Sequence, residues 1–166
     1  MHRPFPTMTS RMSDTPASRA LQVVTFALVG SILLTVSAKV QIPFWPVPLT
    51  MQTFVVMVLG LAYGSRLGAA TVALYLAQGA LGLPVFAEGG GLVYFTGPTG
   101  GYLVGFLVAA MLLGHLADRG WHRSVGRALL AALVGDTVIF ACGAAWLSVL
   151  IRSEERRVGK ECIVKC

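Results

Sequence analysis

The sequence predicts an all-α protein, a polytopic bundle of membrane-spanning helices. Hydrophobic residues make up 55% of the chain and charged residues only 12%, and the mean hydropathy is +0.74. Soluble domains carry about 25% charged residues. The charges lie between long apolar segments, while prolines and glycines gather in two loops. Because a span needs roughly 20 residues, 166 residues allow about five spans in one domain, with no separate soluble domain.

Five apolar segments define the predicted spans. Several are short for a membrane helix, so we expect tilted helices or helix ends that are buried in protein. The predicted spans are Leu21–Ala38, Leu49–Tyr63, Leu67–Leu83, Gly101–Leu116 and Ala128–Ile151.

Basic residues set the predicted orientation, because loops on the cytoplasmic side are enriched in Lys and Arg. An N-terminus inside the cell leaves Lys39 alone outside. The formal charge of +6 then reflects topology, and we do not expect nucleic-acid binding. The basic residues placed inside are Arg3, Arg11, Arg19, Arg66, Arg119, Arg123 and Arg127.

The N-terminal segment, residues 1–19, is polar and without periodicity, which predicts a disordered cytoplasmic tail. Arg19, the apolar stretch after it and Val36-Ser37-Ala38 imitate a secretory signal peptide. The stretch is longer than the usual apolar region of such a peptide, and four more spans follow it. We therefore expect that the segment is retained and that residues 20–151 form the membrane domain.

The C-terminal segment changes abruptly to mixed charge at Arg152. Residues 152–162 resemble the in-frame translation of a common sequencing-adapter oligonucleotide, so we expect 152–166 to be a non-native tail. The alternative is a solvated helix end beside the membrane. Cys162 and Cys166 lie in this segment and Cys142 lies in the fifth span, which supports neither a metal site nor a disulfide framework.

Enzyme motifs are absent from the sequence. Gly159-Lys160 is followed by Glu161 and so does not complete a phosphate-binding loop, and there is no His-Glu-x2-His or Gly-x-Ser-x-Gly motif. His115 and His122 border the fourth span, where a membrane-interface position is expected. We predict that the protein is not an enzyme.

Two loops rich in proline and glycine, residues 42–52 and 82–101, are predicted on one face of the membrane as a ligand lid. Trp45 fits the interfacial aromatic belt or a cover over the ligand. Polar side chains gather at this end of the spans, and a polar ligand ring would supply their hydrogen-bond partners. These side chains are Thr50, Gln52, Tyr75, Gln78, Tyr94, Thr96 and Thr99.

Asp136 is the one ionisable residue deep within a predicted span. A carboxylate there costs about 2.5 to 3.5 kcal/mol, so it should face protein or a water-filled cavity. The sequence leaves two interpretations open, a functional carboxylate and a hydrogen bond across a helix interface. Small residues spaced four apart, such as Ala27 and Ser31, or Gly64 and Gly68, predict close helix packing within the bundle or against a partner.

Three separated segments resemble signatures of the BioY family, biotin-binding S components of energy-coupling factor (ECF) transporters. They are residues 37–54, 74–86 and 97–106, and the resemblance covers about residues 21–151. It implies six helices with both ends cytoplasmic, in the cell membrane. It also implies biotin as transported substrate, captured from outside, with a transmembrane coupling protein and two ATPases as partners and no cofactor.

The last helix of that family begins with a Pro-Gly-Asp-x2-Lys-like motif, which does not follow Ile151 here. We therefore expect an incompletely covered pocket and poor biotin binding. The resemblance makes Ala27 and Ser31 candidates for docking the coupling protein. The ligand carboxylate is expected at the start of the fourth span. The ligand-binding candidates are Gln52, Tyr75, Gln78, Phe86, Tyr94, Gly97, Thr99, Gly100, Gly101 and Asp136.

Two other classes of function remain as alternatives. A proton-coupled secondary transporter would use Asp136 as a proton relay, and its uptake would collapse with the proton gradient. A lipid-modifying membrane enzyme would need a nucleophile and a base together. The histidines of the predicted spans lie at the inner side, away from the outer polar cluster, which disfavours this enzyme.

Overall fold

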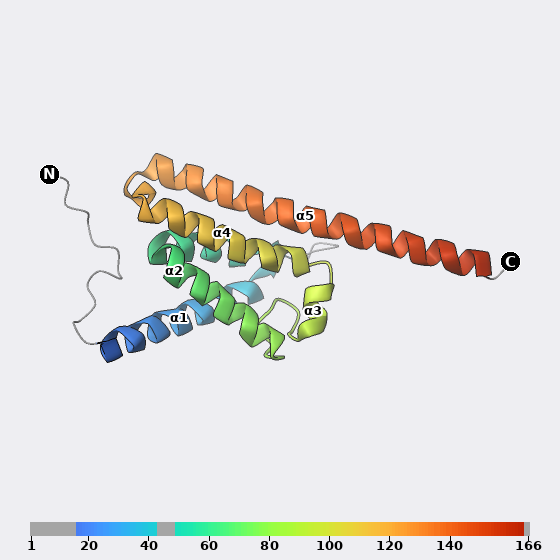
Figure 1. The fold of residues 1–166 in the computed structure, drawn as a ribbon, viewed down its shortest axis with the longest axis horizontal. Coiled ribbons are helices and arrows are strands. Elements are labelled where there is room, and N and C mark those ends of the chain that lie inside the picture. The colour runs from blue at the N-terminus through green and yellow to red at the C-terminus, as the bar shows by residue number, and fades with distance from the viewer. Residues whose placement is uncertain (1–15, 43–48, 165–166) are drawn as a thin grey trace.

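The computed structural model describes residues 16–42 and 49–164, and it is a helical bundle (Figure 1). Trp45, the centre of the first loop and most of the predicted N-terminal tail lie outside the described residues. The elements are α1 (Pro16–Lys39), β1 (Gln41–Ile42), β2 (Leu49–Thr50), α2 (Gln52–Ala80), α3 (Leu92–Thr96), α4 (Gly100–Asp118), a 3₁₀ turn η2 (Trp121–Arg123) and α5 (Val125–Val164).

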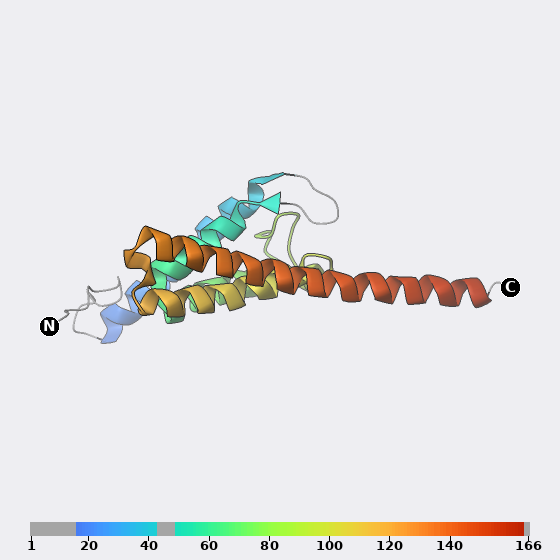
Figure 2. The same ribbon diagram turned by 90° about the horizontal axis from the view of Figure 1, so that it is seen from above.

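Within the described residues, four helices are long and apolar enough to cross a membrane, over Ala20–Lys39, Gln52–Ala80, Gly100–Asp118 and Val125–Ser153. The predicted second and third spans, Leu49–Tyr63 and Leu67–Leu83, fall mostly in the single helix α2, whereas Leu49–Thr50 forms β2. The count of five spans stays a prediction. Helix α4 packs against α2 and α5, and α1 packs against α2. Helix α5 extends well beyond the other helices (Figures 1 and 2), so the predicted tail is helical as far as Val164.

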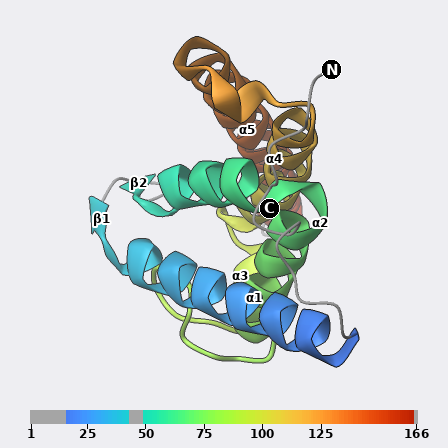
Figure 3. The same cartoon turned by 90° about the vertical axis from the view of Figure 1, so that its left-hand side faces the viewer.

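Helix α2 is interrupted at Gly64, whose φ of 79° and ψ of 179° are not helical. The chain folds back there, because a Cβ atom at Gly68 would lie only 3.4 Å from the Cα of Gly60. Asp118, at the end of α4, accepts hydrogen bonds from the Ser65 backbone N–H (3.2 Å) and from Ser65 Oγ (2.6 Å). It thus caps the second arm of α2, where a carboxylate offsets unpaired N–H groups. Figure 3 shows the two arms of α2, which run in different directions.

Small residues let α2 and α4 approach closely, as the spacing predicted. A Cβ atom at Gly60 would lie 3.0 Å from Leu113 Cβ. The backbone of Ser65 leaves no room for a side chain at Gly114. The buried core beside these contacts comprises Leu34, Val56, Leu59, Val72, Tyr75, Val85, Phe86, Leu103, Phe106, Ala109, Ala110 and Ile139.

Two loop regions meet at one end of the bundle, here called the loop end. Strand β1 pairs antiparallel with β2, with Gln41 opposite Thr50. The segment before α3 lies beside this ribbon (Figure 2), and Lys39, which precedes β1, reaches across to Phe86. The opposite end, here called the turn end, carries Gly64, Asp118 and η2. The fold therefore brings the described ends of the first predicted loop, Gln41–Ile42 and Leu49–Thr50, to the same end of the bundle as the second loop.

Candidate functional site

A cavity of about 90 Å³ lies at the loop end. Its wall is formed by β2, the start of α2, the segment before α3, α3 itself, α4 and α5. Its wall is mostly aromatic and aliphatic, with a few polar groups, which is the composition expected of a small-molecule site. The lining residues are Thr50, Gln52, Thr53, Phe86, Ala87, Tyr94, Thr99, Tyr102, Leu103, Phe106, Ile139 and Phe140.

Gln52 is the most informative polar group of this cavity. It begins α2, where β2 ends, and only 4% of its surface is exposed. Its Nε2 atom is buried and makes no hydrogen bond of good distance and angle to the described residues, although the Gln52 side chain lies near the Tyr75 hydroxyl. An unpaired buried donor costs about 1 to 3 kcal/mol. An acceptor atom of a bound ligand would satisfy the Gln52 amide and remove this cost.

Phe86 and Tyr94 form an aromatic wall. Their rings are stacked, with centroids 4.8 Å apart and an interplanar angle of 25°. Phe95 and Tyr75 meet the Phe86 ring edge to face, at 5.6 and 5.5 Å. Gly79 makes room for Phe86, because a Cβ atom at Gly79 would overlap its ring. The wall is therefore rigid and offers a flat apolar surface to a ring system.

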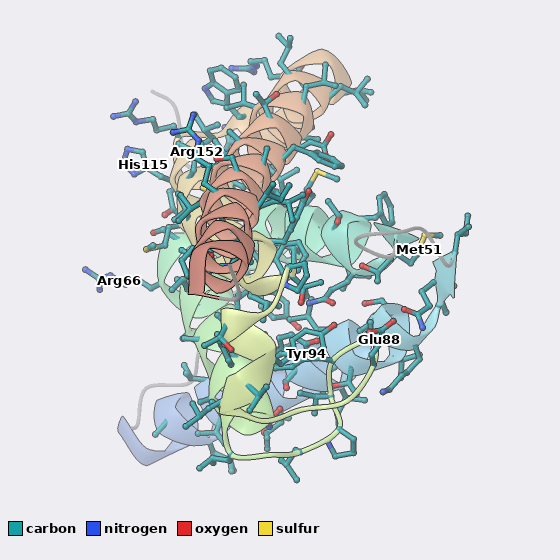
Figure 4. The ribbon with its side chains drawn as sticks, turned by 90° about the vertical axis from the view of Figure 1, so that its right-hand side faces the viewer. Met51, Arg66, Glu88, Tyr94, His115 and Arg152 are labelled. Atoms are coloured by element: carbon teal, nitrogen blue, oxygen red, sulfur yellow. The ribbon has the colours of Figure 1, made fainter. Side chains whose placement is uncertain are left out.

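Tyr94 also contributes a hydroxyl group. Burial raises the pKa of Tyr94, and the charge of Glu88 raises it further, whereas interactions with Thr99 and with the backbone of Glu88 lower it. The net direction is upward, so the hydroxyl stays protonated at neutral pH and can donate or accept a hydrogen bond. Figure 4 shows Tyr94 beside the loop that carries Glu88.

Of the ligand-binding residues predicted from the sequence, the structure places Gln52, Phe86, Tyr94 and Thr99 in the cavity wall. The cavity wall does not include the other predicted residues. Tyr75 donates its hydroxyl to the Val85 carbonyl at 3.0 Å. Gln78 accepts a short hydrogen bond from Ser31 through Oε1. Asp136 is half-buried on α5.

The glycines at the start of α4 have packing roles. Gly97 accepts a hydrogen bond from Trp146 Nε1 at 3.0 Å, and Gly100 donates to the Gly97 carbonyl at 3.1 Å. A side chain at Gly101 would overlap Trp146. Thr99, the N-cap residue between them, is the one residue of this turn that lines the cavity.

The predicted docking residues on α1 are covered in this structure. Ala27 is 7% and Ser31 is 1% exposed, and Ser31 is hydrogen-bonded to α2 through Gln78. Their small size serves close packing of α1 on α2 here. A role in partner docking stays a prediction.

Several lining residues were not predicted, and most are apolar. Tyr102 and Phe106 lie one helical turn apart on α4, and Tyr102 also meets Phe140 edge to face at 6.1 Å. Tyr102 comes three residues after Thr99, and this spacing on one helix face was an available signal. Ile139 and Phe140 had no such signal, because they differ from lipid-facing residues only in the packing of α5.

Comparisons with known proteins identify the family to which this chain belongs. A model of the BioY family matches residues 8–162. The chain belongs to the BioY family. The BioY relatives include "Biotin transporter BioY" of Thermotoga maritima, 37% identical over 76% of this chain and 74% of its own length. Another is "Biotin transporter BioY" of Rhodobacter capsulatus, 38% identical over 73% of this chain and 66% of its own length. The chain thus spans about two thirds to three quarters of these BioY proteins.

A solved structure supports the BioY assignment independently. The crystal structure of the S-component for biotin from an ECF-type ABC transporter, at 2.1 Å, superposes with a TM-score of 0.70 and 26% identity. The similarity covers 82% of this chain and 76% of that one. The chain therefore has the S-component fold of a multi-pass membrane protein and belongs to a family of transporter components, which are not enzymes.

Proposed function

We propose that this protein is the biotin-binding S component of an ECF transporter in the cell membrane. It captures biotin from outside in the cavity at the loop end. A transmembrane coupling protein and ATPase subunits then drive transport. The proposal rests on the family, on the names of the relatives and on a cavity whose chemistry suits biotin.

The unpaired Nε2 of Gln52 is the observation that carries the proposal. The ureido group of biotin has a carbonyl oxygen that accepts hydrogen bonds and two N–H groups that donate them. Gln52 supplies a donor for the carbonyl, and the hydroxyls of Thr53 and Tyr94 are available for the N–H groups. The stacked pair Phe86–Tyr94 covers the fused rings.

The biotin carboxylate is proposed to lie near the N-terminus of α4, at Gly97–Gly101, where the helix dipole favours an anion. Substituting valine for Gly100 or Gly101 tests this poorly, because a side chain at either position would overlap neighbouring atoms. Thr99→Val is the better variant, since Thr99 faces the cavity at the same turn. It should weaken biotin more than the uncharged biotin amide.

The proposed topology has five crossings, because α2 folds back at Gly64 and so contributes two. The N-terminus is cytoplasmic and the loop end faces outward. Positive charge at the turn end supports this orientation, because loops on the cytoplasmic side are enriched in Arg and Lys. The basic residues are Arg66, just after Gly64, and Arg119, Arg123 and Arg127, after the end of α4. Docking of the coupling protein at Ala27 and Ser31 would require α1 to move on α2, because both residues are covered.

The test exchanges the polarity of the proposed hydrogen bond. In 2-iminobiotin a guanidinium group replaces the ureido carbonyl, so the acceptor becomes a cationic donor. The wild-type protein should bind biotin more tightly than 2-iminobiotin. In Gln52→Glu the ratio of the two dissociation constants should shift towards 2-iminobiotin by at least about tenfold. The reason is that hydrogen bonds to charged groups contribute about 1.5 to 3 kcal/mol. Calorimetry on the purified full chain in nanodiscs measures both ligands. An unchanged preference in Gln52→Glu would contradict this placement of biotin.

The proton-coupled alternative has less structural support, because Asp136 does not line the cavity. Uptake assays in vesicles separate the two mechanisms. ATP-driven uptake with the partner subunits should persist when the proton gradient is dissipated at constant ATP, whereas proton-coupled uptake should stop and should depend on Asp136.

A further inference from the structure

Two side chains from different helices hold adjacent carbonyl groups of the segment that leads to α3. Tyr75, on α2, donates its hydroxyl to the Val85 carbonyl at 3.0 Å. Lys39, the last residue of α1, donates Nζ to the Phe86 carbonyl at 2.7 Å. A third bond, from the Gly91 N–H to the Gly79 carbonyl at 2.7 Å, fixes the far end of the same segment. Residues 83–91, here called the lid segment, are thus fastened to α1 and α2.

These bonds fix the position of a cavity wall. Phe86 is 1% exposed, lines the cavity and stacks on Tyr94, which also lines it. The remaining backbone bonds of Phe86 are made to Gly89, within the lid segment itself, at 2.9 and 3.4 Å. They shape the segment and do not fasten it to the bundle. The two side-chain donors therefore fasten the Val85–Phe86 backbone to the bundle, in addition to the packing of the Phe86 ring on Gly79 and its aromatic neighbours.

We propose that Lys39 and Tyr75 are positioning residues that act through Phe86 and do not bind the ligand. The inference rests on the proposed function for the identity of the ligand. Neither residue lines the cavity, and both use their polar atoms on lid carbonyls. It revises the expectation that the Tyr75 hydroxyl meets the ligand directly. Under this proposal, Lys39 does not pair with the ligand carboxylate. Its ammonium group makes a charge-assisted hydrogen bond to the Phe86 carbonyl and so holds the lid segment.

A ligand-free experiment tests the positioning role. In a full chain whose native cysteines are replaced by serine or alanine, Val85→Cys introduces a thiol at a buried lid position. Its reaction with a maleimide then reports opening of the lid segment. Lys39→Met and Tyr75→Phe should each raise the labelling rate about fivefold, the change expected for loss of one hydrogen bond. Lys39→Arg, which keeps a cationic donor, should stay near the parent rate.

A matched thiol in the core separates lid opening from general unfolding. Ala110→Cys lies on α4 and is fully buried, so its labelling should not change in Lys39→Met or Tyr75→Phe. If the Val85→Cys rate is unchanged in both variants, or rises only together with the Ala110→Cys rate, the proposal is wrong.

Ligand binding supplies the second readout. Lys39→Met should weaken biotin and biotin amide by the same factor, because the lid segment covers both. A loss confined to biotin would show that Lys39 binds the carboxylate and would overturn the proposal. Tyr75→Phe should weaken biotin and 2-iminobiotin by the same factor, because Tyr75 does not contact the group that differs between them. If neither this chain nor a chain with the C-terminal segment of the Thermotoga maritima relative in place of residues 152–166 binds biotin or biotin amide, the proposed function fails. The labelling experiment still decides the positioning role in that case.

Discussion

At the scale of single residues, the cavity contains one buried polar atom, Gln52 Nε2, that lacks a hydrogen-bond partner among the described residues. Most buried polar groups in proteins are paired, and the Gln78 amide follows that rule through Ser31. Gln52 is more deeply buried than Gln78, yet its Nε2 makes no hydrogen bond of good geometry to the described residues. A difference of this kind separates a packing residue from a binding residue more clearly than residue type does.

Gln52→Leu is predicted to have opposite effects on stability and on binding. Removing an unpaired buried donor should leave the free energy of unfolding unchanged or raise it by about 1 kcal/mol. Biotin affinity should fall about tenfold, since the ligand carbonyl loses its donor. Thermal unfolding in detergent and calorimetry measure the two quantities. A parallel loss of both would assign Gln52 to packing, and Gln78→Leu provides the comparison because it breaks an existing hydrogen bond.

Sequence reasoning assigned Gln52, Phe86, Tyr94 and Thr99 to the ligand site because polar or aromatic residues beside proline and glycine stand out in an apolar chain. All four line the cavity, and their contact with a ligand stays a prediction. It assigned Tyr75 and Gln78 to the same site because they share that chemistry. The structure gives their polar atoms to Val85 and Ser31. Composition indicates that polar atoms in a membrane need partners, but only the packing of α1 and of the lid segment decides which partners they find.

At the scale of elements, the break in α2 determines how the chain reaches the loop end. The five predicted spans were placed from where charge is absent, and Arg66 marked a boundary between the second and third. The structure puts the reversal two residues earlier, at Gly64, without any intervening loop. Propensity could not fix this point, because the conformation depends on Asp118, far away in the sequence.

Gly64→Ala is predicted to destabilise the fold by about 1 to 3 kcal/mol. Its φ of 79° is a conformation that residues with a Cβ atom rarely adopt, and that atom would lie 2.6 Å from Asp118 Oδ1. Gly126→Ala is the matched control, because no atom lies within 4 Å of its Cβ position and alanine favours a helix. Thermal unfolding should show a loss in the first variant and none in the second. Equal stability in both would mean that the reversal adapts to a side chain.

At the scale of the whole molecule, the two ends of the bundle differ in chemistry. The loop end holds the cavity, while the turn end carries arginines beside tight turns. Exposed apolar side chains between them, such as Leu28, Ile32, Leu129 and Leu133, suit contact with lipid. This polarity agrees with the proposed orientation, which labelling can test.

Single cysteines at Leu92 and Val125 should report opposite sides of the membrane. Both positions are well exposed, at 70% and 79%, so substitution should not disturb packing. In a background without native cysteines, a membrane-impermeant maleimide added to intact cells should label Leu92→Cys and leave Val125→Cys unlabelled until the cells are opened. The reverse pattern would invert the proposed topology.

The final prediction concerns the open side of the cavity. Ile139 and Phe140 of α5 form part of its wall, yet Phe140 is 45% exposed, and Val149 and Ile151 farther along are also exposed. The relatives are longer than the part that this chain matches. Replacing residues 152–166 by the C-terminal segment of the Thermotoga maritima relative should cover this face. Biotin affinity should then rise by at least about tenfold, which corresponds to about 1.4 kcal/mol of additional binding free energy.

A scrambled segment of the same composition is the control for that replacement. It should leave the affinity unchanged, since only a helix whose apolar face matches α5 can close the cavity. Calorimetry with biotin compares the original chain, the replacement and the scrambled control. If the original chain already binds biotin as tightly as the replacement, the cavity is complete with α5 alone, and Gln52 and the aromatic wall are sufficient for capture.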